Sequence, residues 1–292
     1  MRTILVIMLM LLLTACGSGA ASTDGRLDVV AAENVYGNIA AQIGGRHVSV
    51  TSILTSPNAD PHLFEPGSSN GLAVAGAKLV LQNGLGYDAF MTKLEDAAPS
   101  SGRLVVTIAD VLGVHGKDAN PHLWYDVPQL GRIAASIGAA LERADPRHRA
   151  AYRAGVSRFD RSLGPLRREV AAIRASFRGA AVAYTEPVPG YLVTAAGLRN
   201  LAPDSFTRQI EDGTEPSPSS VAAMDELIAQ HRIRVLLYNA QAVSPITARL
   251  RSAALSAGIP VVAVRETLPP GLTFQRWQLE QARALAAALA KA

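Results

Sequence analysis

PRHRAAYRAGVSRFDRSLGPLRREVAAIRASF, at residues 146–177, decides how the rest of the chain is organised. Its apolar residues recur at alternating spacings of four and three, the pattern of one buried stripe on a helix. They are Tyr152, Val156, Phe159, Leu163, Leu166, Val170 and Ile173. Pro165 should kink or locally loosen this helix. The stretch therefore predicts one long, stiff helix that joins the two halves of the chain.

Short apolar runs alternate with helical patterns on both sides of this helix. Because Gly and polar residues bound each run, the alternation indicates βαβ units and parallel sheets. The predicted strands cover residues 27–32, 48–54, 78–82 and 103–108, and then 180–184, 198–201, 234–238 and 260–264. The predicted helices cover residues 36–43, 68–77, 88–97, 129–143, 190–196, 219–230, 245–257 and 275–291.

This pattern predicts an α/β fold of two lobes. Each lobe has a four-stranded, mainly parallel sheet with flanking helices, and one long spine helix joins the lobes. The predicted boundaries are 27–143 for the N-terminal lobe, 144–178 for the connecting helix and 179–292 for the C-terminal lobe.

Polar side chains lie just after the predicted strands or in the loops that follow them. They are Glu33, His62, Asn83 and His122 in the first half, and Glu186, Asn239, Gln241 and Glu266 in the second. In an open parallel sheet, ligands bind beyond the carboxyl ends of the strands. Two histidines from one lobe and Glu186 from the other would then meet in a cleft between the lobes. A set of two imidazoles and a carboxylate suits zinc, manganese or iron.

Two short phrases of the first half nearly repeat each other. One is DPHLFEP at residues 60–66 and the other is NPHLWYD at residues 120–126, so that His62 and His122 each follow a proline. Proline fixes its own φ and favours extended geometry in the residue before it, which gives each histidine a stiff backbone. A nearby carboxylate can fix the tautomer of such an imidazole. The repeat therefore favours both histidines as metal ligands.

The N-terminus predicts export. Arg2 precedes an apolar run that is too short to span a bilayer, which is typical of a signal peptide over residues 1–15. The run ends in LTACG, which looks like a bacterial lipobox with Cys16 as the lipidated first residue of the mature chain. Cys16 is the only cysteine, so no internal disulfide can form. Residues 16–26 then predict a flexible tether to the membrane.

The charge balance argues against a nucleic-acid partner. Cleavage before Cys16 removes one basic residue, and 27 basic against 24 acidic side chains leave a net charge of +3. The arginines cluster between Arg143 and Arg178, on the predicted spine, where a solvated helix face accounts for them better than a binding groove does. We predict a monomer without nucleic acid.

At this point the chain resembles the metal-binding solute-binding lipoproteins of bacterial zinc and manganese ABC importers. The resemblance rests on the two Pro-His phrases, on AENVYG at residues 32–37, on YTE at residues 184–186 with Tyr191 after it, and on residues 260–267. It implies two α/β lobes joined by one long helix. It also implies that His62, His122 and Glu186 bind the metal, and that a membrane permease of the ABC type receives it.

The chain departs from that family pattern in two places. The family usually takes a fourth ligand, an Asp, from the segment after the third strand of the second lobe, and residues 237–245 hold no carboxylate. Water, Gln241, Asn239 or a residue of another loop such as Glu266 could fill the place, and Asp126 is a further candidate for the surroundings of the metal. Many zinc-specific members also carry a His-rich loop between the first two ligand motifs, where this chain has only His115.

We therefore predict extracytoplasmic, high-affinity capture of a divalent transition metal, zinc or manganese, and its delivery to an ABC permease. The metal would be cargo and the protein would not be an enzyme. One alternative is a lipid-anchored metal-dependent hydrolase, because a missing fourth ligand leaves an open coordination position. Against it, the sequence contains no His-Glu-x-x-His and no nucleophile elbow of the Gly-x-Ser-x-Gly form, since GSSNG at residues 67–71 does not directly follow a predicted strand. The other alternative is a surface adhesin, a name sometimes given to members of this family.

Overall fold

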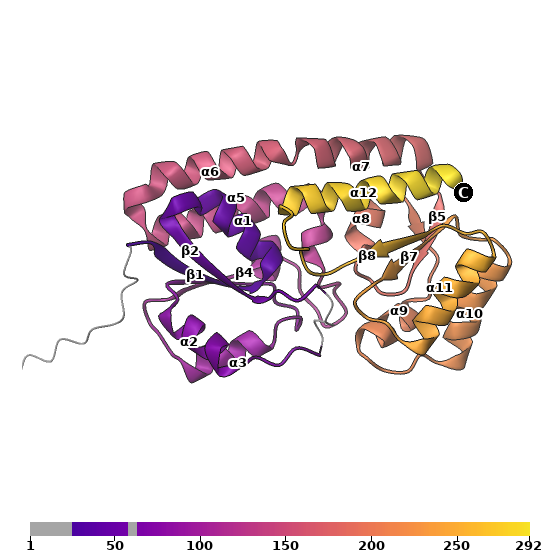
Figure 1. The fold of residues 1–292 in the computed structure, drawn as a ribbon, viewed down its shortest axis with the longest axis horizontal. Coiled ribbons are helices and arrows are strands. Elements are labelled where there is room, and N and C mark those ends of the chain that lie inside the picture. Colours follow the sequence, from indigo (N-terminus) through magenta and orange to yellow (C-terminus); the bar gives the residue numbers. More distant parts are fainter. Residues whose placement is uncertain (1–24, 58–62) are drawn as a thin grey trace, which may run out of the picture.

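A computed structural model describes residues 25–57 and 63–292. Figure 1 shows two lobes side by side beneath a layer of long helices. The sheet of the N-terminal lobe has the order β2 (Val48–Leu54), β1 (Leu27–Glu33), β3 (Leu79–Gln82), β4 (Leu104–Thr107). The sheet of the C-terminal lobe has the order β6 (Arg199–Asn200), β5 (Ala181–Tyr184), β7 (Val235–Asn239), β8 (Val261–Val264). Every pairing is parallel, so the predicted pair of four-stranded sheets is confirmed.

The central strands are buried on both faces. All five residues of β7 are buried, as are six of the seven residues of β1. A parallel sheet covered by helices on both sides requires such near-continuous apolar strands. The two sheets also share one topology, because β1 and β5 hold the same second place in their respective orders. Their carboxyl ends therefore present matching loops.

Helices cover both sheets. The N-terminal lobe has α1 (Asn34–Gly44), α2 (Ser68–Gly76), α3 (Phe90–Ala97), α4 (Ile108–Leu112) and α5 (Leu130–Ala144). The C-terminal lobe has α8 (Gly190–Ala195), α9 (Asp204–Glu211), α10 (Pro218–Ala229), α11 (Pro245–Ser256) and α12 (Phe274–Lys291). Short 3₁₀ turns lie at Gly45–His47, Leu123–Tyr125, Val127–Gln129 and Pro146–His148. The sequence pattern does not predict α4 and α9, both of which are short.

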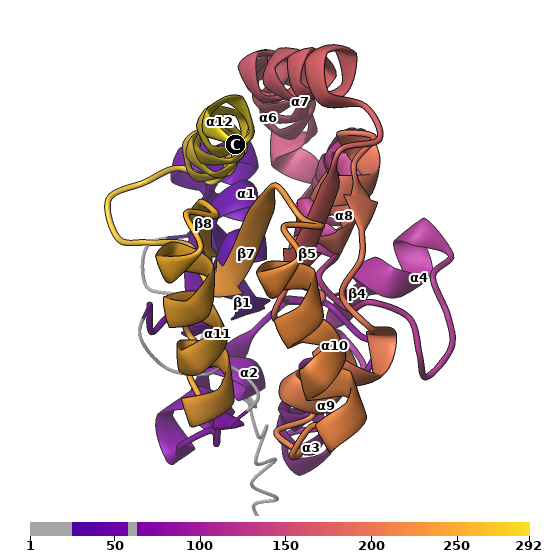
Figure 2. The same ribbon diagram turned by 90° about the vertical axis from the view of Figure 1, so that its right-hand side faces the viewer.

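The spine consists of two consecutive helices, α6 (Arg149–Ser162) and α7 (Gly164–Phe177), with Leu163 between them. Pro165 lies in the first turn of α7, where its missing N–H removes no helical hydrogen bond. The proline thus starts a second helix and does not merely bend a single one. Helix α6 packs on α1 and α5 of the N-terminal lobe, whereas α7 packs on α12 of the C-terminal lobe. Figures 1 and 2 both show α6, α7 and α12 on one side of the two lobes, opposite α9, α10 and α11.

One apolar core runs through the molecule. It contains the core of the N-terminal lobe, the buried stripe of the spine and residues of the C-terminal lobe such as Val182, Val235 and Leu285. A second, smaller cluster lies on the other side of the C-terminal sheet, around Leu236, Met224 and Leu250. The shared core couples the spine to both lobes. Among the described residues, every helix is too short or too polar to cross a membrane.

Candidate metal centre

The carboxyl ends of the two sheets bring three ionisable side chains together between the lobes. His122 lies in the loop that follows β4 and α4, Glu186 follows β5, and Glu266 follows β8. These side chains are almost completely buried, with 0% of His122, 1% of Glu186 and 1% of Glu266 exposed. Buried ionisable groups are costly unless they are paired or bind a cation, so this cluster marks a functional site.

The imidazole of His122 contacts a different partner at each ring nitrogen. Its Nε2 lies 3.3 Å from Oε2 of Glu266, across the boundary between the lobes. Its Nδ1 lies 2.8 Å from Oδ1 of Asn120 and 3.8 Å from Oε1 of Glu211. The face of the ring is walled by Tyr87 and Trp124, whose centroids are 5.6 Å and 5.3 Å away in edge-to-face arrangements. Packing and hydrogen bonding therefore hold the ring with Nε2 toward the C-terminal lobe.

The two carboxylates of the C-terminal lobe share one hydrogen-bond donor. Nδ2 of Asn239 donates to Oε2 of Glu186 and also to Oε1 of Glu266, the latter over 2.7 Å. Tyr87 of the other lobe donates its hydroxyl to Oε2 of Glu266 over 2.9 Å. Two buried carboxylates so close together repel each other, and a cation bound beside them would offset that repulsion.

Asn239 and Gln241 brace this arrangement. Oδ1 of Asn239 accepts the backbone N–H of Gln241 over 3.0 Å. Oε1 of Gln241 accepts the backbone N–H groups of Glu266 and Thr267, over 2.7 Å and 3.2 Å. Nε2 of Gln241 donates to Oγ1 of Thr267 over 2.9 Å. The oxygen atoms of both amides already accept backbone N–H groups. The two side chains therefore position the loops that carry the carboxylates.

Of the other residues named from sequence, Asp126 is half-buried, and burial raises the pKa of its carboxyl group while the backbone N–H of Gln129 lowers it. His62, with the rest of residues 58–62, lies outside the described residues. Within residues 25–57 and 63–292, no three histidine, cysteine, aspartate or glutamate side chains are grouped so that they could hold a metal ion by themselves.

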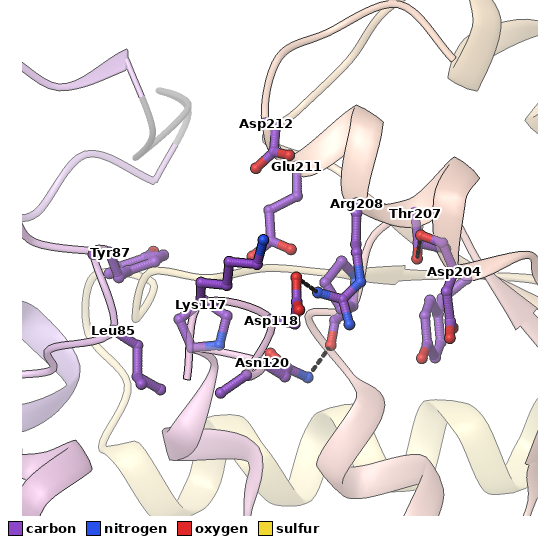
Figure 3. Close-up of a pocket in the computed structure, with 15 residues that line it drawn as sticks. Leu85, Tyr87, Lys117, Asp118, Asn120, Asp204, Thr207, Arg208, Glu211 and Asp212 are labelled. Atoms are coloured by element: carbon purple, nitrogen blue, oxygen red, sulfur yellow. Dashed lines mark hydrogen bonds and ion pairs between the residues drawn. The ribbon is translucent and has the colours of Figure 1, made fainter. Parts of the chain in front are cut away.

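A cavity of about 420 Å³ opens beside His122, between the two lobes. Figure 3 shows it lined by Tyr87, Lys117 and Asn120 from one lobe and by Arg208 and Glu211 from the other. An ion pair joins the two sides of its lining, with Nη1 of Arg208 on α9 lying 3.1 Å from Oδ1 of Asp118. The cavity borders the buried cluster, because Tyr87 and Glu211 line it and contact Glu266 and His122 respectively.

The loop after β3 positions Tyr87 in this site. Gly84, Leu85 and Gly86 all have positive φ, at 84°, 57° and 84°, which is unusual for Leu85 and easy for glycine. Asp88 fixes the start of the loop, because its two carboxylate oxygens accept the backbone N–H groups of Asn83 and Gly84 over 2.5 Å and 2.9 Å. The strained turn brings the Tyr87 hydroxyl to Glu266.

Comparison with known proteins places the chain in a family. The sequence profile described as "Zinc-uptake complex component A periplasmic" matches residues 29–288. The chain belongs to this family. The manganese-binding lipoprotein MntA of Bacillus subtilis (strain 168) is 30% identical over 213 residues, which are 66% of this chain and 68% of that protein.

Further relatives cover more of the chain at lower identity. The manganese ABC transporter substrate-binding lipoprotein scaA of Streptococcus gordonii is 24% identical over 241 residues, 76% of this chain and 75% of that protein. Among solved structures, the periplasmic zinc binding protein TroA of Treponema pallidum has a TM-score of 0.74 at 20% identity, over 91% of this chain and 99% of that one. This zinc-uptake family therefore shares the two-lobe fold described above.

Several residues of the centre were given no role in the sequence reasoning. Asn120 is the first residue of the NPHLWYD phrase, but the phrase by itself assigns it no contact. Tyr87 lies four residues beyond the predicted edge residue Asn83. Glu211 and Arg208 lie on α9, which was not predicted at all. The combination of Pro203 with Asp204 signals a helix start and could have revealed α9.

Proposed function

We propose that this protein captures one zinc or manganese ion between its lobes, outside the cytoplasm, and delivers it to an ABC permease. Membership of the zinc-uptake component A family supports extracytoplasmic metal capture for import. The names of the Bacillus and Streptococcus relatives describe a manganese-binding lipoprotein and an ABC transporter substrate-binding lipoprotein. The observation that carries the proposal is the buried contact of Nε2 of His122 with Oε2 of Glu266, an imidazole nitrogen and a carboxylate oxygen from opposite lobes that lie 3.3 Å apart.

The proposed ligands are His62, His122, Glu186 and Glu266. Glu266 is preferred for the fourth place because it contacts His122 directly and shares the donor Asn239 with Glu186. Gln241 and Asn239 hold the loops that carry these carboxylates, and the structure gives Asp126 a contact with the backbone of Gln129. Residues 237–245 hold no carboxylate for the fourth ligand position, and Glu266, in the loop after β8, would take that position.

This ligand set bears on the choice of metal. Two imidazoles and two carboxylates suit both zinc and manganese. Each carboxylate that replaces an imidazole or a thiolate makes the ligand set more favourable for manganese, because manganese prefers oxygen ligands. Zinc still binds an identical site more tightly than manganese does, by the general order of divalent affinities. The proposal therefore names both ions, with the carboxylates as the part that makes manganese competitive.

The family consists of substrate-binding proteins of ABC importers, and the hydrolase alternative is not favoured. A catalytic zinc site keeps one coordination position open for water. Here Glu266 would occupy the position on which that alternative depended.

We also propose that Cys16 carries the lipid, that residues 16–26 tether a monomer to the outer face of the membrane, and that the permease meets the protein there. The signal segment and Cys16 lie outside the described residues. Metabolic labelling with a radioactive fatty acid tests the anchor, since Cys16→Ser should abolish incorporation. Labelling that persists in this variant would contradict the proposal.

The metal site is tested by elemental analysis and by calorimetric titration of the metal-free protein with zinc and manganese. We expect one ion per chain, and we expect His62→Ala or His122→Ala each to abolish tight binding of both ions. The exposed His115 provides the matched control, because His115→Ala should bind like the wild type. A stoichiometry near zero, or unchanged binding in both ligand variants, would overturn the proposal.

A further inference from the structure

Asn120 connects the two halves of the proposed site. Its Oδ1 accepts the backbone N–H of His122 over 3.0 Å and lies 2.8 Å from Nδ1 of the same residue. Its Nδ2 donates to the carbonyl of Pro187 in the other lobe over 2.7 Å. Pro187 directly follows Glu186, so one side chain contacts the backbone beside a proposed ligand in each lobe. Figure 3 shows the Nδ2 bond crossing from Asn120 to the neighbouring lobe.

The partners of Asn120 fix which end of its amide is which. A backbone N–H can only donate, so the atom facing the N–H of His122 must be the oxygen. A backbone carbonyl can only accept, so the atom facing Pro187 must be the nitrogen. Flipping the amide would place two donors together at one end and two acceptors at the other. The orientation of Asn120 therefore follows from hydrogen bonding alone.

This orientation favours one tautomer of His122. Two acceptors compete for the single hydrogen of the neutral ring: Oδ1 of Asn120 lies 2.8 Å from Nδ1, whereas Oε2 of Glu266 lies 3.3 Å from Nε2 and already accepts the Tyr87 hydroxyl. The shorter contact favours hydrogen on Nδ1, which leaves the lone pair on Nε2, the atom that faces Glu266. An imidazole binds a metal only through a nitrogen without hydrogen. Asn120 thus presents the nitrogen that points toward the carboxylates of the other lobe.

We propose that Asn120 is the positioning residue of this site: it selects the Nδ1–H tautomer of His122 and ties that ligand to the Glu186 segment across the cleft. The inference rests on the proposed metal site and adds two separable roles to it. The acceptor Oδ1 sets the ring, which governs affinity. The donor Nδ2 holds the lobes together, which governs how fast the metal leaves.

Gly190 supplies the room that Asn120 needs. It is the first residue of α8, and a Cβ added there would lie only 2.8 Å from Nδ2 of Asn120. Alanine is otherwise favourable at a helix position. Gly190→Ala therefore displaces the Asn120 amide without changing any proposed ligand, and it provides a second route to the same defect.

The tautomer is read by NMR of metal-free protein labelled with ¹⁵N-histidine, at a pH at which the rings are neutral. We expect the wild type to show His122 with hydrogen on Nδ1. Asn120→Asp keeps an acceptor and should keep this tautomer, whereas Asn120→Ala should lose it. Tyr191→Phe is the matched control, because it removes a different bond across the cleft, from the Tyr191 hydroxyl to the Asn120 carbonyl over 2.9 Å, and leaves the amide in place.

Binding and release separate the two roles. Titration with zinc and manganese should show that Asn120→Ala weakens affinity roughly 10- to 100-fold, as loss of a group that orients a ligand does. Mixing the loaded protein with a chelator should show release from Asn120→Asp that is roughly 2- to 10-fold faster than from the wild type, because one hydrogen bond across the cleft is gone. Tyr191→Phe should release faster to a similar degree, and Gly190→Ala should behave like Asn120→Ala.

The possible outcomes distinguish this inference from the proposed function. If the wild type binds no metal, the site itself is wrong. If the wild type binds metal and His122→Ala does not, but His122 keeps hydrogen on Nδ1 in both Asn120→Ala and Gly190→Ala, the tautomer role is overturned. If Asn120→Asp releases metal at the wild-type rate, the tie across the cleft is overturned. Thermal unfolding of each variant checks that it is folded.

Discussion

Each lobe buries two carboxyl groups at the carboxyl edge of its sheet, and the two pairs are stabilised in different ways. Glu33, the last residue of β1, and Asp88 form the pair in the N-terminal lobe, with 2% and 4% of the residues exposed. Glu186, after β5, and Glu266 form the pair in the C-terminal lobe. Because β1 and β5 hold equivalent places in their sheets, Glu33 and Glu186 arise from equivalent strands.

The first pair has raised pKa values. Burial, and then the charge of Asp88, raise the pKa of Glu33 well above its ordinary value. Burial also raises the pKa of Asp88, and the two backbone N–H groups that it accepts lower it, so Glu33 is the member of the pair that keeps a proton more readily. The second pair has the Asn239 amide and the Tyr87 hydroxyl as donors and the imidazole of His122 opposite. One fold thus yields an acid pair within one lobe and, in the other, the pair that we propose binds a cation.

The largest effect is expected from neutralising one carboxylate of the C-terminal pair. Glu266→Gln keeps the shape of the side chain but removes its charge and one ligand oxygen. Calorimetric titration should show that manganese affinity falls at least about 100-fold, more than the loss caused by removing a group that only orients a ligand. Zinc affinity should fall less, because imidazole ligands contribute more to zinc binding.

Glu211→Gln is the control for that comparison. Glu211 also lies near His122, at 3.8 Å from Nδ1, but on the opposite side from Glu266. Its replacement should change the affinity of either ion by no more than a few-fold. Equal losses in the two variants would show that general negative charge, and not the Glu186–Glu266 pair, binds the metal.

The next effect concerns the donor that the two carboxylates share. Asn239→Ala removes the Nδ2 group that bonds both Glu186 and Glu266, so the carboxylates lose their common position. We expect affinity for both ions to fall roughly 10- to 100-fold in the same titration. Asn200→Ala, in the edge strand β6, removes an amide that bonds Ala202 and should leave affinity unchanged. Wild-type affinity in Asn239→Ala would contradict the bracing role.

Features of the two carboxyl pairs that depend on local sequence patterns can be predicted from the sequence, whereas contacts between distant segments cannot. The strands and the edge rule placed His122, Glu186 and Glu266 near one another from local patterns alone. The contact between His122 and Glu266 depends on how the lobes are set against each other, which the short-range pattern does not encode. For the same reason Asn120, Tyr87 and Glu211 received no role. Glu33 was named only as an edge residue, because neither its burial nor its proximity to Asp88 follows from spacing.

In the N-terminal pair, we expect replacement of Asp88 to lower the stability of the protein. Asp88→Asn leaves one acceptor for the N–H groups of Asn83 and Gly84 and turns a second donor toward them. A buried donor without a partner costs about 1–3 kcal/mol, so the free energy of unfolding should fall by that amount in urea titrations. Asp96→Asn changes an exposed carboxylate and should have little effect. An equal loss in both variants would show that Asp88 does not hold the turn.

The smallest effect, and the one that depends most on pH, is expected in the free energy of unfolding when Glu33 is replaced. A raised pKa means that folded Glu33 keeps its proton after the unfolded chain has lost it. Its contribution to stability is therefore complete below the ordinary value of 4.5 and is lost as pH rises through the folded value. Glu33→Gln carries a permanent neutral donor toward Asp88 and does not titrate.

The stability of Glu33→Gln relative to the wild type should therefore increase with pH. The gain cannot exceed about 1.4 kcal/mol for each pH unit between the ordinary and the folded pKa. Thermal and urea unfolding of both proteins between pH 4 and pH 8 measure this difference, with Asp96→Asn as the exposed control. A difference that stays flat with pH would show that Glu33 is ionised in the folded protein. The two carboxyl pairs would then be alike, and the N-terminal lobe would also need a cation or a further donor at its sheet edge.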